Sequence, residues 1–456
     1  MGAICCGQFK AAGPARAEYI QAQTKYGSQT SQMIVATDDR IQFVGRSVVN
    51  GTDREYSYAS GVIRFLVKGP ASSISILCGT PKNGTRGKKM RGLGGKNKGG
   101  VPLKPGSMMN VYHNGVHVDK IGVDIGEARH CIIAQNLSAQ TETLIEVSRC
   151  SEGFSGLLIF KGIFLPETCE LLQPPPKRKL IEFVGDSDTT AQVGLGPFTL
   201  NVSAIFANYV TWGDADYGWA HYVARAFGCD YINSSTGGIG ICYQGDKFGK
   251  RNKAGPAHEH YDDKINFNWG VEEKDEKFSV GEMGPVDLVV VWLGQNDVVA
   301  GHGPGKVAEG IVGYEKLLSA IRKHRVETPI LCLYPTGIIH TNHPKNPLFG
   351  GNKKKCLAVN SDIKAYINGA IEKWGGDEKE LNIFARGFEM SPAFDPATDY
   401  GAFGELGVGG ARKLARGTLP LVKEITGWEI VSEVPEKGRH GALPETTTAQ
   451  YVTETK

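Results

Sequence analysis

The hydrophobic pattern of this chain changes at three consecutive prolines, Pro174–Pro176. Before them, short segments alternate apolar and polar residues, which is the period of a strand with one buried face. After them, apolar residues recur every three or four positions between short apolar runs, which is typical of helices alternating with buried strands. A polyproline segment is stiff and commonly marks a domain boundary. The sequence therefore predicts two domains of different architecture.

The first half of the chain has the pattern of an antiparallel β-sandwich. Gly, Asn and Pro separate its strand-like segments, and no helical pattern interrupts them. We expect the sandwich over residues 37–172, after a polar arm over 1–36 and before a linker over 173–179. The clearest strand-like segments are residues 62–67, 73–77, 144–147 and 157–160.

The second half predicts a doubly wound parallel sheet over residues 180–432, followed by a polar tail over 433–456 that has no core of its own. Ser361 is a candidate N-cap for one of its helices. Strands are expected near residues 180–184, 286–293 and 329–333, and helices near 219–227, 311–321, 363–374 and 410–425.

Composition narrows the class of protein. A net charge of +3 over 456 residues gives no global field for nucleic acid. No apolar stretch reaches the roughly 18 residues of a spanning helix, and there is no signal-peptide core, so we expect a protein that is not secreted. The ten cysteines lack CxxC spacing, which favours reduced thiols in the cytoplasm over a disulfide framework or zinc site. We predict no cofactor and no metal.

A Gly-Asp-Ser sequence ends the first predicted strand of the second domain and makes Ser187 the candidate nucleophile. In open α/β sheets, ligands bind beyond the carboxyl ends of the strands, where Ser187 is expected to lie. The alternative is structural, because Asp186 and Asp188 are also typical turn and N-cap residues.

Two later sequences offer donors for an oxyanion. Gly238, in a glycine-rich segment after a strand-like run, lets a backbone N–H approach a ligand closely; the alternative is an ordinary turn. Asn296, in Gly-Gln-Asn-Asp after residues 286–293, carries a side-chain amide donor; the alternative is an Asx turn.

Together, these three blocks resemble the SGNH (GDSL-like) hydrolases over residues 180–428. With Gly45-Arg46 and the preceding strand pattern, the chain resembles carbohydrate esterase family 2, which deacetylates xylan and related sugars through a serine nucleophile. The resemblance implies a jelly-roll domain before a three-layer α/β/α domain. It also implies Ser187 as nucleophile, with Gly238 and Asn296 at the oxyanion positions.

The family's last block, Asp-x-His, is absent. Phe403 stands at the aspartate position and Glu405 at the histidine position. A glutamate has an ordinary pKa of about 4.3 against about 6.5 for histidine. It would need strong desolvation to act as a base near neutrality, and we expect no aspartate to orient it. His340 and His343, in a loop after residues 329–333, are candidate replacements or ordinary loop histidines.

Three other features remain open. Gly2 resembles an N-myristoylation acceptor, with Cys5 and Cys6 as palmitoylation sites; the alternative is an unmodified arm with free thiols. Residues 82–100 form a basic, glycine-rich segment that is either solvated or bound to an anionic partner. His258 and His260 form a His-x-His pair, either in a solvated loop or at a metal site.

The sequence therefore predicts a catalytically inactive relative of the esterases. We expect it to bind other proteins in a membrane-associated or cytoskeletal assembly, in the cytoplasm, with membrane contact only through an acylated N-terminus. The first alternative is an active serine esterase of acetylated carbohydrates that uses Ser187 and a relocated base. The second is a module that binds glycan without turning it over.

Overall fold

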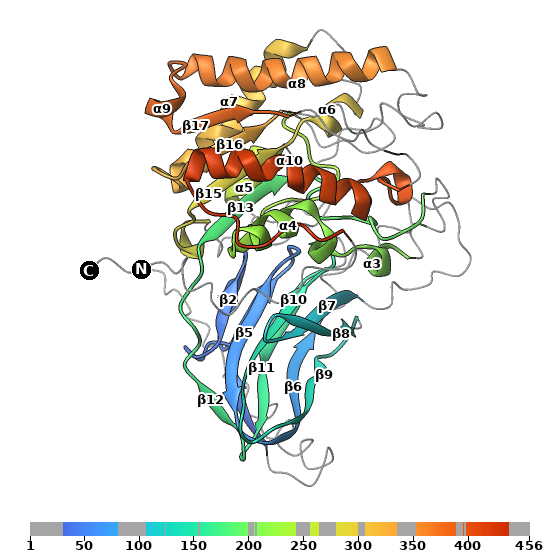
Figure 1. The fold of residues 1–456 in the computed structure, drawn as a ribbon, viewed down its shortest axis with the longest axis vertical. Coiled ribbons are helices and arrows are strands. Elements are labelled where there is room, and N and C mark those ends of the chain that lie inside the picture. The colour runs from blue at the N-terminus through green and yellow to red at the C-terminus, as the bar shows by residue number, and fades with distance from the viewer. Residues whose placement is uncertain are drawn as a thin grey trace, which may run out of the picture.

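The fold of the chain is given by a computed structural model, in which a β-sandwich packs against an α/β domain (Figure 1). Gly2, Cys5, Cys6, His340, His343 and the basic segment 82–100 lie outside the described residues. The described residues are 31–80, 106–123, 125–153, 156–198, 205, 208–242, 256–263, 280–299, 306–334, 353–388, 395 and 398–436.

Two antiparallel sheets make up the first domain (Figure 1). One has the order β3 (Val48–Asn50), β4 (Asp53–Tyr56), β11 (Leu158–Pro166), β6 (Ala71–Gly79) and β9 (Arg129–Leu137), with β1 (Ser31–Val35) also paired to β11. The other has the order β12 (Glu170–Leu172), β5 (Val62–Lys68), β10 (Glu142–Arg149), β7 (Ser107–His113) and β8 (Val116–Val123), with β2 (Gln42–Val44) paired to β5. Their facing side chains form one buried cluster, so the predicted antiparallel sheets are confirmed. The narrower jelly-roll topology stays a prediction.

The sandwich begins earlier than its predicted start at residue 37. Strand β1 pairs antiparallel with β11, and Ile34 is buried in the core between the sheets. The polar residues around this single strand hide its period in the sequence. Residues 31–36 therefore belong to the sandwich and not to the predicted arm.

A five-stranded parallel sheet forms the centre of the second domain, as predicted. Its order is β14 (Asp230–Asn233), β13 (Leu180–Gly185), β15 (Leu288–Trp292), β16 (Ile330–Leu333) and β17 (Ile383–Arg386). The chain reverses its direction of travel across the sheet between β13 and β15, and the ends of these two strands carry Ser187 and Asn296. Such a switch point is where open α/β folds place their ligands.

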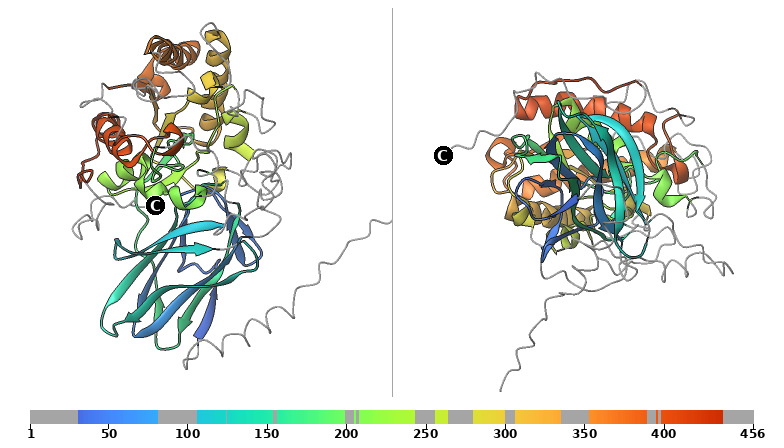
Figure 2. Two further views of the ribbon diagram at one scale, coloured as in Figure 1. Left: turned by 90° about the vertical axis from the view of Figure 1, so that its right-hand side faces the viewer. Right: turned by 90° about the horizontal axis from the view of Figure 1, so that it is seen from below.

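Helices cover both faces of this sheet (Figures 1 and 2). Val289 and Val291 of β15 pack in the cluster that includes α7 and α8, whereas Val290 and Trp292 pack in the cluster that includes α4 and α10. The helices are α3 (Tyr209–Trp212), η6 (Ala215–Tyr217), α4 (Trp219–Ala226), α5 (Ala257–Asp263), η7 (Val280–Met283), α6 (Gln295–Val299), α7 (Val307–His324), α8 (Lys353–Lys373), α9 (Glu378–Leu381), η8 (Ala402–Gly404) and α10 (Val408–Thr426). None of the described helices is long and apolar enough to cross a membrane.

Two local predictions are wrong. Ser361 is not an N-cap but lies inside α8, which begins at Lys353; the apolar period is visible only from Ile363 onward. Val434, in the predicted tail, is buried in the same cluster as α10, because the chain turns back over that face after the helix.

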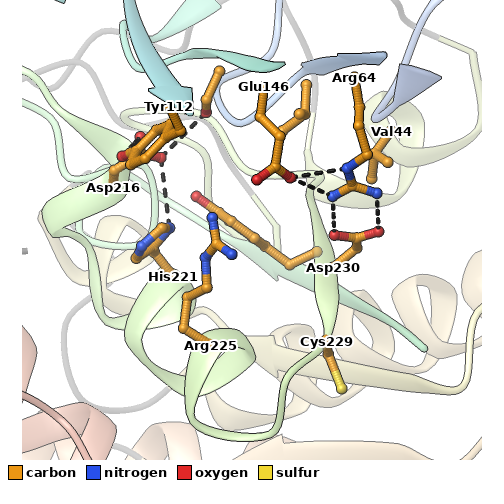
Figure 3. A pocket seen from close by; sticks show the side chains of 12 residues that line it. Val44, Arg64, Tyr112, Glu146, Asp216, His221, Arg225, Cys229 and Asp230 are labelled. Atoms are coloured by element: carbon orange, nitrogen blue, oxygen red, sulfur yellow. Dashed lines mark hydrogen bonds and ion pairs between the residues drawn. The ribbon is translucent and has the colours of Figure 1, made fainter. Parts of the chain in front are cut away.

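Buried ion pairs hold the two domains together (Figure 3). The Arg64 guanidinium of β5 donates to Glu146 Oε1 at 2.8 Å and reaches across the interface to both carboxylate oxygens of Asp230, at 2.8 and 2.5 Å. Burial by itself raises the pKa values of Glu146 and Asp230, but the charges of Arg64 and Arg178 and the hydrogen bonds from Arg64 together outweigh burial and hold both pKa values below their usual range. All three groups are therefore charged at neutral pH.

Asp216 of η6 receives a second set of contacts from the outer face of the sandwich. Its carboxylate accepts hydrogen bonds from Tyr112 Oη at 2.5 Å, Asn110 Nδ2 at 2.7 Å and Ser148 Oγ at 3.2 Å. His221 Nδ1 lies 3.5 Å from the same carboxylate. Between these contacts and the Arg64 cluster lies a cavity of about 20 Å³ (Figure 3), which is room for a single water molecule.

We predict that Arg64→Met destabilises the protein far more than Lys68→Met on the same strand. Loss of Arg64 leaves two buried carboxylates with only the longer contacts to Arg178, at 3.5 and 3.6 Å, and breaking a buried pair in this way costs up to about 3–5 kcal/mol. The exposed pair between Lys68 and Glu142 contributes less than about 1 kcal/mol. Urea unfolding of both variants measures the difference. Equal, small losses would show that the interface does not depend on this cluster.

Candidate functional site

Ser187 lies at the carboxyl end of β13, where the sequence places it. Its residue is 7% exposed, and its carbonyl oxygen accepts hydrogen bonds from Gln192 N–H and Thr190 Oγ1, both at 3.0 Å. Gly185, two residues earlier, must be glycine because a Cβ there would meet Thr189 Oγ1 at 2.1 Å. The turn after β13 therefore packs back onto the strand end and fixes the serine in place.

Asn296 is engaged in the interior of the site. Its Nδ2 donates to Asp186 Oδ2 at 3.2 Å and to the Ile239 carbonyl at 2.9 Å, so both amide hydrogens have acceptors. The next residue, Asp297, accepts the N–H groups of Ile241 and Cys242. The predicted oxyanion amide thus joins the three blocks to one another.

Gly238 has the left-handed conformation expected of a glycine at a close approach, with φ of 76°. The neighbouring Gly237 N–H donates to Glu152 Oε1, and the Tyr209 hydroxyl donates to Glu152 Oε2. Gln192 Nε2 in turn contacts the Tyr209 hydroxyl. Glu152 follows β10 in the first domain, so the sandwich supplies a carboxylate to the site of the second domain.

Glu405 lies beside the carboxyls that flank Ser187. The Leu406 N–H donates to Asp188 Oδ1 at 2.6 Å, and the side chains of Glu405 and Asp188 are hydrogen-bonded. The sequence predicts no aspartate to orient Glu405, but Asp188 is hydrogen-bonded to it. The partner comes from the first block and not from position 403, whose backbone lies in η8.

Crowding of carboxyls raises their affinity for protons. Burial, followed by repulsion from Glu405, raises the pKa of Asp186 to about 8. The pKa of Asp188 is raised well above its usual range by burial and then by the Glu405 and Asp186 carboxyls. At neutral pH these groups hold protons that free carboxyls would release.

The described histidines lie elsewhere. No imidazole within the described ranges is hydrogen-bonded to Ser187. His221 is at the domain interface, and His258 and His260 lie on α5, where they are part of no three-residue metal-ligand group among the described residues. The proposed replacements His340 and His343 lie outside the described residues.

Sequence reasoning did not identify Glu152, Tyr209 or the role of Asp188. Asp188 was visible as a flank of the serine block, but nothing in its spacing connects it with position 405. Glu152 and Tyr209 belong to no motif, and only the packing of the two domains brings them together.

Comparison with solved structures finds the same two-domain fold. A family two carbohydrate esterase from Cellvibrio japonicus aligns over 88% of this chain and 99% of its own, with a TM-score of 0.65 and 16% identity. An acetyl xylan esterase from the rumen bacterium Butyrivibrio proteoclasticus aligns over 88% and 100%, with a TM-score of 0.66 and 16% identity. A family two carbohydrate esterase from Clostridium thermocellum, in complex with cellohexaose, aligns over 85% and 99%, with a TM-score of 0.60 and 16% identity.

These similarities confirm the predicted resemblance to SGNH hydrolases of the family two type at the level of fold. No protein-family model and no curated protein sequence matches the chain. Structural similarity at 16% sequence identity shows a shared fold. It does not show a shared activity, which depends on the residues of the site.

We predict that the protein loses stability as the pH rises toward 9. The raised pKa of Asp186, about 8 in the folded state, means that the folded chain binds a proton that the unfolded chain has released above about pH 4. The stabilisation is complete at low pH and disappears as the pH passes through 8. Thermal melts between pH 5 and 9 measure this, and Asp186→Asn should flatten the decline. An unchanged slope in that variant would contradict the assignment.

Proposed function

We propose that this chain keeps the fold of a carbohydrate esterase but binds a ligand or partner without catalytic turnover. The observation that carries the proposal is the set of groups around Ser187. Carboxyls of Asp186, Asp188 and Glu405 gather where a serine hydrolase requires an imidazole.

A protonated carboxyl is a poor base for this reaction. Attack by a serine hydroxyl requires a neighbouring group that takes its proton during the step and later returns it. The raised pKa values of Asp186 and Asp188 favour their neutral forms at pH 7, which donate hydrogen bonds and accept protons weakly. Loss of a triad base commonly costs several orders of magnitude in rate.

The groups that would stabilise the oxyanion support the same proposal. Both hydrogens of the Asn296 amide are used by Asp186 and Ile239. A single missing oxyanion donor costs about 10²–10³ in rate in well-studied hydrolases. The site therefore lacks the usual base, and one of its oxyanion donors is already hydrogen-bonded within the protein.

The binding role has two proposed forms. As an acetylated-glycan binder, the chain would use the site that the structurally similar acetyl xylan esterase and the cellohexaose complex suggest. As a scaffold, which we favour, it would join other proteins in a cytoplasmic assembly at a membrane or on the cytoskeleton. Acylation at Gly2, Cys5 and Cys6 would supply the membrane contact.

One contact favours the second candidate function, an active esterase with a carboxyl base. Asp188 is hydrogen-bonded to Glu405, so a protonated Asp188 can orient an ionised Glu405 as an aspartate orients the imidazole of a triad. In this candidate, Glu405 takes the Ser187 proton and gives it to the leaving group. Its activity would require ionised Glu405 and would disappear in Glu405→Gln.

We predict that wild-type protein and Ser187→Ala hydrolyse p-nitrophenyl acetate and acetylated xylan at rates within about threefold of each other, because the hydroxyl lacks a competent base. Ser319→Ala, at an exposed position on α7, controls for nonspecific effects. Turnover that depends on Ser187 would overturn the proposal. Its further loss in Glu405→Gln would then establish the carboxyl base, and its persistence would direct the search to His340 and His343.

We also predict that the N-terminus is acylated in cells. A myristate analogue should label the wild-type chain and fail to label Gly2→Ala, because the acyl amide forms on the Gly2 amine. Cys5→Ser and Cys6→Ser should retain myristate but move from the membrane to the soluble fraction, since one acyl chain binds marginally. Equal labelling of wild type and Gly2→Ala would contradict the proposed anchor.

A further inference from the structure

Glu152 connects the β-sandwich to the centre of the candidate site. Its residue is 4% exposed, and its two carboxylate oxygens face different parts of the second domain. Oε1 accepts the Gly237 N–H, and Oε2 accepts the Tyr209 hydroxyl. A carboxylate buried to this extent and bound on both oxygens is a fixed part of the site.

The Gly237 segment lies beside the serine block. The Thr236 N–H donates to the Gly185 carbonyl at 3.3 Å, and Asn296 links Asp186 to Ile239. These contacts hold Gly237 and Gly238 between the ends of β13 and β15. The Gly237 N–H therefore belongs to the residue next to Gly238, the position at which the family resemblance places an oxyanion donor.

Tyr209 closes the other side of this arrangement. The Gln192 side chain contacts its hydroxyl, and the Gln192 N–H is bonded to the Ser187 carbonyl. Burial, then the Glu152 and Glu405 charges, raise the pKa of Tyr209 well above its usual range. Glu152 is thus surrounded by groups that act as donors and hold it in one position.

The chemical consequence concerns negative charge. A hydrolase of this fold stabilises the developing oxyanion with backbone N–H groups that are otherwise free. Here the N–H next to that of Gly238 already binds a carboxylate from the same chain, which places the Glu152 charge beside the expected donor. An incoming acyl oxygen that gained negative charge would also meet the like charge of Glu152, which disfavours it.

We propose that Glu152 is an internal anion that occupies the donor side of the site and excludes acyl groups and other anions from it. This inference rests on the proposed loss of turnover and deepens it. In addition to the engaged Asn296 amide, activity is prevented by Glu405 in place of the base and by Glu152 beside the oxyanion donors. Restoring the base alone should therefore leave the site inactive.

The test uses full-length protein carrying Phe403→Asp and Glu405→His, which rebuilds the family's last block. Its Ser187 is reacted with a fluorophosphonate, whose addition develops negative charge on the phosphoryl oxygen, and labelling is followed by intact mass. The rebuilt variant should label within about tenfold of wild type. Adding Glu152→Ala should raise the labelling rate about 10²-fold, which is the usual contribution of one oxyanion donor. Adding Glu170→Gln, an exposed glutamate on β12, should change nothing.

A second arm separates the charge from the contact and covers misfolding of the alanine variant. Glu152→Gln keeps the shape and removes the charge, so it should give a smaller rise in labelling. Acetate should raise the melting temperature of otherwise wild-type protein carrying either Glu152 substitution, and leave wild-type protein unchanged. Rapid labelling in the rebuilt variant before Glu152 is changed would overturn the proposal, as would no rise in labelling and no acetate effect in either substitution. The proposed loss of turnover fails separately, if unmodified protein shows Ser187-dependent hydrolysis.

Discussion

The ion pair between Arg64 and Asp230 is the interaction on which the rest of this molecule depends. It joins the sandwich directly to the parallel sheet, and Glu146 completes it from the sandwich side. Buried charges of this kind require good geometry, because a partner displaced by even a small distance leaves an unpaired charge. The interface therefore has one register. In this arrangement Glu152 of the sandwich lies against Gly237 of the second domain. The presence of Glu152 in the candidate site therefore depends on how the domains pack together.

Around Ser187, the close packing of carboxyl groups changes their protonation. Three carboxyls share a volume in which a hydrolase requires one base, and the raised pKa values of Asp186 and Asp188 reduce the negative charge that the group would otherwise carry. Neutral carboxyls are compatible with burial, which explains how Asp186 and Asp188 can lie under a closed surface. The arrangement is therefore internally consistent as part of a buried structural core.

Much of the fold could be predicted from the sequence because its signals are local and repeated. The apolar run of β15 and the helical face that includes Leu317 each have one physical explanation. The site was only partly predictable, because Glu152 and Tyr209 are distant in sequence and share no motif with Ser187. Strand β1 and the buried Val434 were missed for a related reason, since single segments carry too few residues to establish a period.

The structural role of the Asn296 side chain gives a reason for its retention that does not involve catalysis. It joins the Asp186 carboxylate to the Ile239 carbonyl, and thereby ties together chain segments more than fifty residues apart in sequence. Substituting it would loosen the strand ends even in a molecule that never hydrolysed an ester. The hallmark residues of a hydrolase can thus be retained by selection for folding alone. Their presence in a relative of this chain is then not by itself evidence of catalysis.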